Sequence, residues 1–457
     1  MLGNGISNNT IIKDLISKDI ISTTKQAMNT CYNYYHNKPD ILQRQQVYYV
    51  DGAPVQYNTK SNNRLVNNYF KLLVDQKMGY LVGNPINLTS YSKNKTVIDD
   101  IYSVLGEKWD DVMCELVKNV SIQGQYWLHP YINSEGAFDY QIVDSRQIIP
   151  IFDQAYQTKL LALIRYYTIQ IVDEKGKEVN RYKVEYWDSE KCSYYIEDKD
   201  GDYVLDDTES INPCYHWYSY NTTNVAEVKA HSWGKVPWIQ FKNNEDSESD
   251  LDSIKTLVDD FNLNMSDFSN NLADIQEMVT VLIGYEGEDL GEFLKDLKVR
   301  KAIKVGVDGD VKSLKQEIPY EARKEHINNL KELIYLFGQG VDFSTDKFGN
   351  SPSGIALRFL FSSLDLKCDV LERKLRTSLR EFFWFVCKYL NKYDYKDIKI
   401  TFKRNTMINE TEIIDNCVKS EGMVSNKTII ERHPWVEDPD LELEALEEEK
   451  LNEVPNV

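Results

Sequence analysis

The most regular pattern of apolar positions in the chain is a stripe with alternating spacings of three and four residues. The stripe consists of Leu251, Ile254, Val258, Phe261, Met265, Phe268, Leu272 and Ile275. This spacing places all of them on one face of a helix. We predict one long helix that carries this stripe, and a second helix over residues 320–337 further along the chain. The acidic segment 244–252 suits the start of the first helix, because carboxylates favour the positive end of the helix dipole.

The residues around these two helices show further patterns. Residues 279–318 alternate strand, helix and strand, which predicts a small α/β insert. A polar, Gly-rich loop follows at 338–353, and a helix of about 38 residues begins straight after it. Six aromatic residues of the long helix are too many for one face, so we expect it to be buried nearly all round. They are Phe359, Phe361, Phe382, Phe383, Trp384 and Phe385.

The N-terminal half changes character near residue 126. Apolar periodicity predicts helices over residues 63–82, 96–105 and 109–122. Residues 126–233 hold short runs rich in Tyr, Val and Ile, separated by polar, Gly-containing turns that are typical of β-hairpins. These turns lie at 133–136, 173–176 and 198–201. The predicted fold class is therefore α+β and mainly helical, with an antiparallel β region.

Charge and cysteine content narrow the function classes. The formal net charge is −19 over 457 residues, whereas a protein that grips DNA through its phosphates gains affinity from Lys and Arg. A conventional DNA binder is therefore excluded, although DNA could pass such a surface without adhering. The seven cysteines are scattered and form no CxxC pair, which indicates reduced thiols. No apolar run approaches about 18 residues, so no membrane span is expected.

Motifs for catalysis are missing from the sequence. There is no GxxxxGK[ST] phosphate loop, and the six histidines form no HExxH motif. The segment from Gly349 to Gly354 does not match GxSxG, and its Ser-Pro step is unsuited to a nucleophile elbow. A loop with a helix N-cap at Ser351 or Ser353 is the better interpretation. We therefore expect no catalytic activity, no metal site and no cofactor.

Several short motifs occur in an order that is typical of one family. They are Asn63-Arg64-Leu65-Val66, Asp75-Gln76-Lys77-Met78-Gly79-Tyr80-Leu81-Val82-Gly83-Asn84-Pro85, Gly234-Lys235-Val236-Pro237, Asn244 with the helix 253–278, Asn350-Ser351-Pro352-Ser353-Gly354-Ile355-Ala356-Leu357 and His433-Pro434-Trp435-Val436-Glu437-Asp438-Pro439. Each is weak alone, but together they span about 370 residues in order. The chain resembles the portal proteins of tailed double-stranded DNA phages, in the siphophage-type family of Gram-positive hosts.

The resemblance implies a portal fold with named parts. The wing would be residues 1–245 with the long helix and strand at 354–404. The stem would be helices 246–278 and 320–337, the small α/β clip 279–319, the tunnel loop 338–353 and a short helical crown 405–457.

The resemblance also implies an assembly and its partners. About twelve subunits would form a ring at one capsid vertex of the virion, after assembly in the host cytoplasm. Double-stranded DNA would enter and leave through the channel without sequence-specific contacts. The clip would dock the terminase packaging motor and later the head-completion (adaptor) proteins, and the ring would meet the major capsid and scaffolding proteins.

Three sets of candidate residues follow from this mapping. In the tunnel loop, Lys347 is the only cation between residues 338 and 353, so it could centre the DNA, or it could be an exposed lysine on a solvated loop. Its polar neighbours are Asp342, Ser344, Thr345, Asp346 and Asn350. Clip candidates for docking, or equally for packing between clips, are Tyr285, Glu286, Glu288, Asp289, Phe293, Lys295, Lys298, Arg300 and Lys301. The stem stripe, chiefly Leu251, Ile254, Val258, Phe261, Met265 and Phe268, would pack on the second stem helix and on a neighbouring subunit.

Two other functions remain open at this point. The chain could be another ring or tail component of a phage, although such proteins should lack the insert between the two predicted stem helices. It could also be a metal-dependent hydrolase of phage type that uses an unmarked carboxylate cluster, although no metal-ligand spacing supports this.

Overall fold

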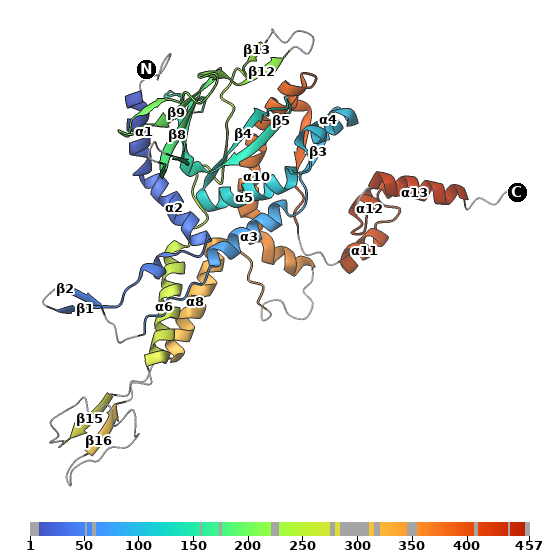
Figure 1. Cartoon of the computed structure of the whole chain (residues 1–457). Coiled ribbons are helices and arrows are strands. Elements are labelled where there is room, and N and C mark those ends of the chain that lie inside the picture. The colour runs from blue at the N-terminus through green and yellow to red at the C-terminus, as the bar shows by residue number, and fades with distance from the viewer. Residues whose placement is uncertain are drawn as a thin grey trace. The chain divides into compact units, whose positions relative to one another are not determined.

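The computed structural model describes residues 9–50, 53–56, 61–155, 158–172, 176–220, 228–274, 279–283, 310–314, 320–344, 354–405, 410–436 and 439–452 (Figure 1). The chain divides into two compact units. The larger unit comprises Met1–Tyr32, Leu72–Asp252 and Gly338–Val457, and the smaller unit comprises Asn33–Lys71 and Ser253–Phe337. Both mix helices and strands, in agreement with the predicted α+β class.

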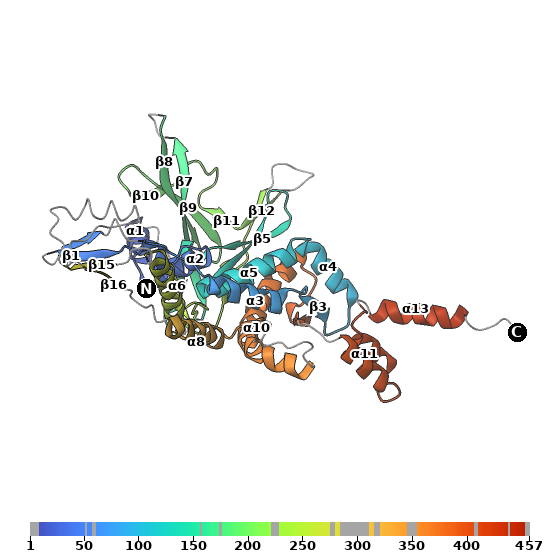
Figure 2. The same cartoon turned by 90° about the horizontal axis from the view of Figure 1, so that it is seen from below.

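Two antiparallel sheets form the centre of the larger unit. The smaller sheet has the strand order β14-β4-β5, with β4 at Gln125–Ile132, β5 at Phe138–Val143 and β14 at Ile239–Lys242. The larger sheet has the order β10-β9-β8-β7-β6, with β11 also paired to β9. Its strands are β6 Ile148–Phe152, β7 Leu160–Val172, β8 Glu178–Trp187, β9 Lys191–Glu197, β10 Tyr203–Leu205 and β11 Cys214–Tyr215. The long β7–β8 hairpin projects beyond its neighbours (Figure 2).

The predicted antiparallel β region is confirmed. Residues 133–136 join β4 to β5, residues 173–176 lie between the paired strands β7 and β8, and residues 198–201 join β9 to β10. Two shorter ribbons pair β12 Trp217–Tyr220 with β13 Val228–His231, and β3 Asn87–Ser90 with β17 Ile398–Thr401. The second ribbon joins segments that lie about 300 residues apart in the sequence (Figure 1).

Side chains on opposite faces of each sheet pack on different elements, so the sheets and helices form layers. On one face of the small sheet, Leu128 and Tyr140 pack with residues of α4 Lys95–Leu105, α5 Trp109–Gln123 and α10 Gly354–Leu390. On its other face, Trp127 and Trp238 pack with Leu163 of the large sheet. The far face of the large sheet receives α1 Asn9–Ile20. Successive side chains of a strand point to opposite faces, so the unbroken run of buried residues in the centre of β4 fits a strand that is covered on both faces.

The long helix matches its predicted span but not its predicted burial. Phe382, Phe383 and Phe385 are fully buried, and Phe382 stacks on Trp109 with ring centroids 5.7 Å apart. Phe359, by contrast, is 77% exposed. The expectation of burial all round is therefore wrong: Arg376, Arg380 and Tyr389 in the C-terminal half are exposed too, so α10 buries one face and keeps the other in solvent.

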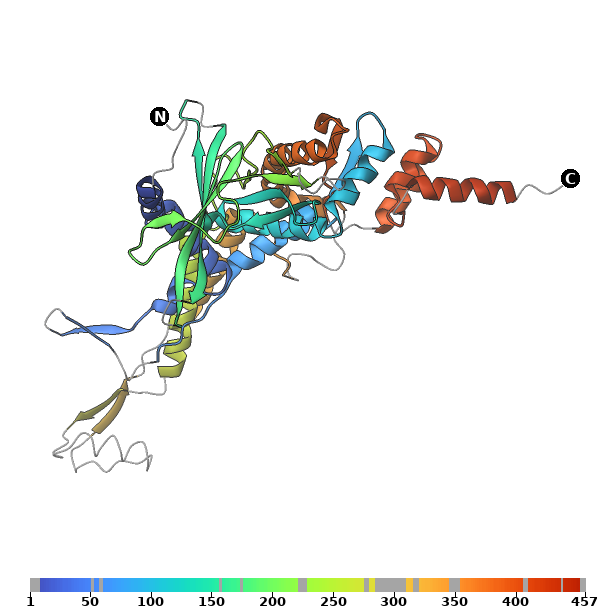
Figure 3. The same ribbon diagram turned by 45° about the horizontal axis from the view of Figure 1, so that its top comes forward.

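The remaining helices complete the larger unit. They are α2 Thr23–Tyr35 and α3 Tyr69–Val82, both of which cross the unit boundary, and α11 Glu410–Lys419, α12 Asn426–Arg432 and α13 Pro439–Asn452. The last three are the red helices of Figure 3. Short 3-10 helices lie at Ser145–Gln147 and Tyr395–Asp397 in this unit and at Asp40–Gln43 in the smaller unit.

Among its described residues, the smaller unit includes a pair of longer helices and two β-ribbons. The helices are α6 Lys255–Asp274 and α8 Tyr320–Gly338, the latter ending one residue past the unit boundary. The ribbons pair β1 Val47–Val50 with β2 Ala53–Gln56, and β15 Val279–Ile283 with β16 Asp310–Leu314. The helix predicted over 246–278 thus begins at Lys255, and residues 251–254 form a turn before it.

Candidate functional site

Helices α6 and α8 lie side by side in opposite directions (Figure 1). Phe268, near the end of α6, approaches Tyr320 at the start of α8, with ring centroids 6.0 Å apart. Further back along α6, Asp260 accepts a hydrogen bond of 3.0 Å from His326. Leu330 and Ile334 of α8 are buried. This helical pair corresponds to the two predicted stem helices.

The apolar stripe is buried at one end and increasingly exposed at the other. Leu251, Ile254, Val258 and Phe261 are buried, and Met265 and Phe268 are half-buried. Leu272 is 53% exposed, and Ile275 lies outside the described residues. Leu251 and Ile254 precede α6, so the stripe continues through a turn rather than along one unbroken helix.

A second face of α6 is buried through polar side chains. Asn262, Ser266 and Asn270 recur every fourth residue and are almost fully buried. They accept hydrogen bonds of 2.8, 2.9 and 2.6 Å from the backbone N–H groups of Asn67, Leu65 and Asn63, respectively. We call residues 61–68 the strap.

The strap corrects one predicted element. The sequence predicts a helix from Asn63, but α3 begins at Tyr69 and residues 61–68 are extended. An extended segment turns alternate N–H groups to the same side, and three polar side chains on α6 match that repeat. Local periodicity carried no signal for partners that lie about 200 residues away.

The base of the loop that follows α8 is fixed within the larger unit. The side-chain amide of Gln76 donates to the Val341 carbonyl at 2.8 Å and accepts from the Val341 N–H at 3.0 Å. Gly340 lies so close to α3 that an added Cβ would stand 2.0 Å from Leu73. These contacts fix residues 340 and 341 against α3.

Two of the predicted tunnel-loop residues can be placed. Asp342 is nearly buried and accepts a hydrogen bond of 3.1 Å from the Ser344 N–H. The other predicted tunnel-loop residues lie outside the described ones: Thr345, Asp346, Lys347 and Asn350.

A buried charge network lies behind this loop base. The Lys77 ammonium on α3 is 3.0 Å from an Asp250 carboxylate oxygen and 2.6 Å from the Asn243 amide oxygen. Lys367 of α10 approaches the same carboxylate at 3.2 Å and donates to the Gly338 carbonyl at 2.9 Å. The Asp250 carboxylate therefore links α3 to α10, and Lys367 extends this network to Gly338 at the end of α8.

Burial sets the protonation of this network. Lys77 is 1% exposed, and desolvation lowers its pKa despite the attraction of Asp250. Desolvation by itself would raise the pKa of Asp250, but Lys367, Lys77 and the Asn243 amide together lower it to about 2. At neutral pH the carboxylate is ionised and balances the ammonium groups around it.

The segment that carries Asp250 packs on the end of α5. The Asn243 N–H donates to the Gly124 carbonyl at 2.8 Å, and the Ser249 hydroxyl donates to the Ile122 carbonyl at 2.6 Å. Gly124 has φ +79°, and a Cβ there would lie 1.9 Å from the Ser247 carbonyl oxygen. The sequence predicted that the acidic segment 244–252 caps the stem helix. The structure corrects this prediction, because the segment does not cap α6. It satisfies the carbonyls at the C-terminal end of α5.

The ribbon of β15 and β16 occupies the position of the predicted clip. Val279 pairs with Leu314 and Ile283 with Asp310 in an antiparallel register. Every candidate docking residue lies between these strands and outside the described residues. They are Tyr285, Glu286, Glu288, Asp289, Phe293, Lys295, Lys298, Arg300 and Lys301.

Two searches bear on other classes of protein. Within the described ranges, no group of three or more His, Cys, Asp or Glu side chains is arranged to hold a metal ion. No helix within those ranges is both long and apolar enough to cross a lipid bilayer.

Comparisons with known proteins cover nearly the whole chain. A family model described as phage portal protein, SPP1 Gp6-like, matches residues 15–456. The portal protein of Bacillus phage SPP1 is 36% identical over 432 residues, which cover 91% of this chain and 82% of that protein. The portal protein of Clostridium phage phiCD119 is 35% identical over 460 residues, with 96% of each chain covered.

Solved structures give a weaker likeness. Chains in the necks of a native and an empty GTA particle align with TM-scores of 0.37 and 0.40, each at 12% identity. They cover 79% and 78% of this chain and 86% of each neck chain. The family is shown instead by the match over residues 15–456 and by the two relatives at 35–36% identity. On these grounds the chain belongs to the phage portal proteins of the SPP1 Gp6-like family.

Proposed function

We propose that about twelve copies of this protein form a ring at one vertex of a phage capsid and that genome DNA passes through the ring during packaging and ejection. The observation that carries the proposal is the family match over residues 15–456, together with two relatives named portal proteins. In the virion the ring would also contact the major capsid protein and, during assembly, the scaffolding protein.

Exposed apolar side chains on α8 support assembly with other copies. Leu336 is 64% exposed and Phe337 is 54% exposed, and Leu333 on the same helix is also exposed. Grouped exposed apolar side chains of this kind mark protein interfaces. A ring of identical subunits needs such a surface on each copy. We propose that this part of α8 packs on the stem of the neighbouring subunit.

The negative net charge of the chain supports the proposal that the channel lets DNA pass without binding it tightly. Each copy carries a net charge of −19, and a ring multiplies that charge around a polyanion. Phosphate binding by many cations would slow translocation, because each neutralised phosphate adds affinity. We propose that Lys347, the single cation of the loop 338–353, guides the duplex with few contacts.

The anchored loop base supports a loop that extends from a fixed support. Gln76 and Lys367 hold residues 338–341 against α3 and α10. On this proposal, the loop beyond Asp342 reaches toward the DNA while its attachment stays in place. The clip residues 279–319 would dock the terminase motor and later the head-completion proteins.

The ring is tested by mass photometry and negative-stain electron microscopy of the purified protein. Particles of about twelve or thirteen subunits with a central hole would support the proposal. A stable monomer or dimer under all conditions would refute it.

The conduit is tested by DNA packaging into capsids that carry variant portals. Deletion of residues 279–319 should abolish packaging while rings still form, because the motor loses its docking site. Lys347→Ala should slow packaging, and Lys388→Ala, at an exposed position of α10, is the matched control. Packaging at the normal rate after the deletion would instead favour a tail or connector component. Metal-dependent DNA cleavage by the purified protein would favour a hydrolase.

A further inference from the structure

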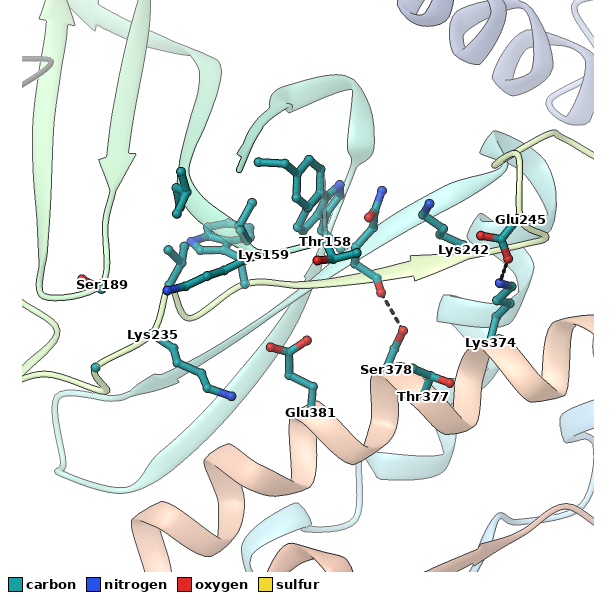
Figure 4. A pocket seen from close by; sticks show the side chains of 18 residues that line it. Thr158, Lys159, Ser189, Lys235, Lys242, Glu245, Lys374, Thr377, Ser378 and Glu381 are labelled. Carbon is teal, nitrogen blue, oxygen red and sulfur yellow. Dashed lines mark hydrogen bonds and ion pairs between the residues drawn. The ribbon is translucent and has the colours of Figure 1, made fainter. Parts of the chain in front are cut away.

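A hollow of about 650 Å³ opens between the two sheets of the larger unit and α10 (Figure 4). Its apolar lining includes Trp127, Phe152 and Trp238. Its polar lining comes from the loop before β7, from residues 234–245 and from the middle of α10. Ser378 of α10 donates a 2.6 Å hydrogen bond to the Gln240 carbonyl, which fixes α10 against β14 at this point.

The hollow is basic, although the chain as a whole is acidic. Four lysines and two glutamates line it, which gives an excess of two positive charges: Lys159, Lys235, Lys242, Lys374, Glu245 and Glu381. In a chain of net charge −19, such a local excess marks a site for an anionic partner. We call this feature the basic hollow.

Among the described residues, Lys374 is the one lysine of the hollow that forms an ion pair. Lys374 pairs with Glu245, and the Lys235 ammonium lies 4.3 Å from the centre of the Trp384 ring. The ammonium groups of Lys159 and Lys242, in contrast, form no ion pair with any residue that the structure describes. Figure 4 shows them on separate sides of the hollow, so a ligand with several carboxylates could reach both.

The two glutamates and the aromatic lining argue against a nucleic acid as the ligand. Glu245 is ionised, because Lys374 lowers its pKa, and it would repel a phosphate backbone. Glu381 is a second carboxyl group in the hollow, and burial of that group raises its pKa. Aromatic and aliphatic side chains beside lysines suit a peptide that carries both carboxylates and apolar residues.

The chain itself holds a segment of this chemistry. Helix α13, Pro439–Asn452, has six carboxylates and one lysine, hence a net charge of −5. Glu442, Glu447, Glu448 and Glu449 are exposed. A head-to-tail ring needs two different, complementary surfaces on each copy. An acidic helix and a basic hollow are such a pair.

We propose that the basic hollow of one copy binds the acidic helix α13 of a second copy. This inference rests on the ring proposed above, and it assigns that ring a specific contact. In this contact, Lys159 and Lys242 bind carboxylates of the helix.

Cross-linking in rings assembled from equal amounts of unlabelled and 15N-labelled chains tests the contact. A carbodiimide joins a lysine to a carboxylate only where the two touch. We expect cross-links from Lys159 or Lys242 to Glu442, Glu447, Glu448 or Glu449, with half of the linked pairs containing one labelled and one unlabelled chain. Links confined to pairs of equal labelling would place α13 in its own chain's hollow and overturn the proposal. Links from these lysines to other segments would also overturn it.

A binding experiment separates the basic hollow from the ring. A fluorescent peptide of residues 439–452 is titrated with a truncated protein that ends at residue 436 and therefore lacks its own α13. Lys159→Glu with Lys242→Glu should weaken peptide binding at least tenfold, whereas Lys388→Glu should leave it unchanged. Peptide binding by a protein that stays monomeric would refute the ring but uphold the hollow as the α13 site. Binding of duplex DNA or of inorganic phosphate in place of the peptide would overturn the proposal.

Discussion

The buried carboxylate of Asp250 gives the sharpest test of the energetic reasoning. In Asp250→Ala, the Lys77 ammonium keeps the Asn243 amide oxygen at 2.6 Å as a partner but loses its counter-ion. Removing one partner of a buried ion pair costs about 3–5 kcal/mol. The free energy of unfolding that Asp250→Ala loses has an upper bound, because the unpaired Lys77 ammonium can become neutral by releasing its proton. Neutralising a lysine at pH 7 costs about 5 kcal/mol from its ordinary pKa.

The same argument predicts a pH dependence with a definite sign. In the variant, the folded-state pKa of Lys77 lies below its unfolded value near 10.5. The unfolded chain then binds the extra proton between these two values, so the stability of the variant rises with pH. The deficit of Asp250→Ala relative to the unaltered protein should therefore shrink from pH 7 to pH 9, by at most about 1.4 kcal/mol per pH unit.

A second substitution should reverse much of the loss. Lys77→Met replaces the unpaired ammonium by an apolar side chain of similar length, and such replacements of buried pairs are often neutral. Asp250→Ala with Lys77→Met should thus be more stable than Asp250→Ala alone. Lys367 keeps the Gly338 carbonyl as a hydrogen-bond acceptor at 2.9 Å.

Thermal unfolding followed by tryptophan fluorescence measures these effects. We expect Asp250→Ala to lower the midpoint by roughly 6–20 °C, at about 2–4 °C per kcal/mol. Glu245→Ala removes the exposed partner of Lys374 and should leave the midpoint nearly unchanged. An Asp250→Ala protein as stable as the unaltered one, or one whose deficit is the same at pH 7 and pH 9, would contradict the assignment of a buried, charged Lys77.

Three further predictions concern other buried groups. Gly124→Ala should destabilise the protein by more than about 2 kcal/mol in chemical denaturation, because a Cβ there meets the Ser247 backbone and φ is positive; wild-type stability would refute this contact. Ser266→Ala should cost about 1 kcal/mol by removing the acceptor of the partly buried Leu65 N–H, while Ser269→Ala, which removes only an exposed hydrogen bond from the Asn63 side chain, should cost less; equal effects would argue against the strap. Burial lowers the pKa of His129 to about 3, so stability should fall by about 2 kcal/mol as the pH drops from 7 to 5, and His129→Gln should show a flatter pH profile in the same melts.

The sequence by itself determined elements whose pattern is local. The helix at 354–390, the helix at 320–338 and the β-hairpins after residue 125 were predicted closely, because their apolar periods and turn residues lie within the element. The family likewise follows from short motifs in order along the chain. No tertiary contact is needed for either inference.

The tertiary structure decided the elements whose partners are distant in sequence. Residues 63–68 carry helical periodicity yet are extended, because Asn262, Ser266 and Asn270 satisfy their N–H groups from another helix. Asp250 belongs to an acidic run that resembles a helix cap, but the fold brings Lys77 and Lys367 to its carboxylate. A hydrogen bond or an ion pair depends on position in space, and pairings across 100 or more residues leave no trace in local periodicity.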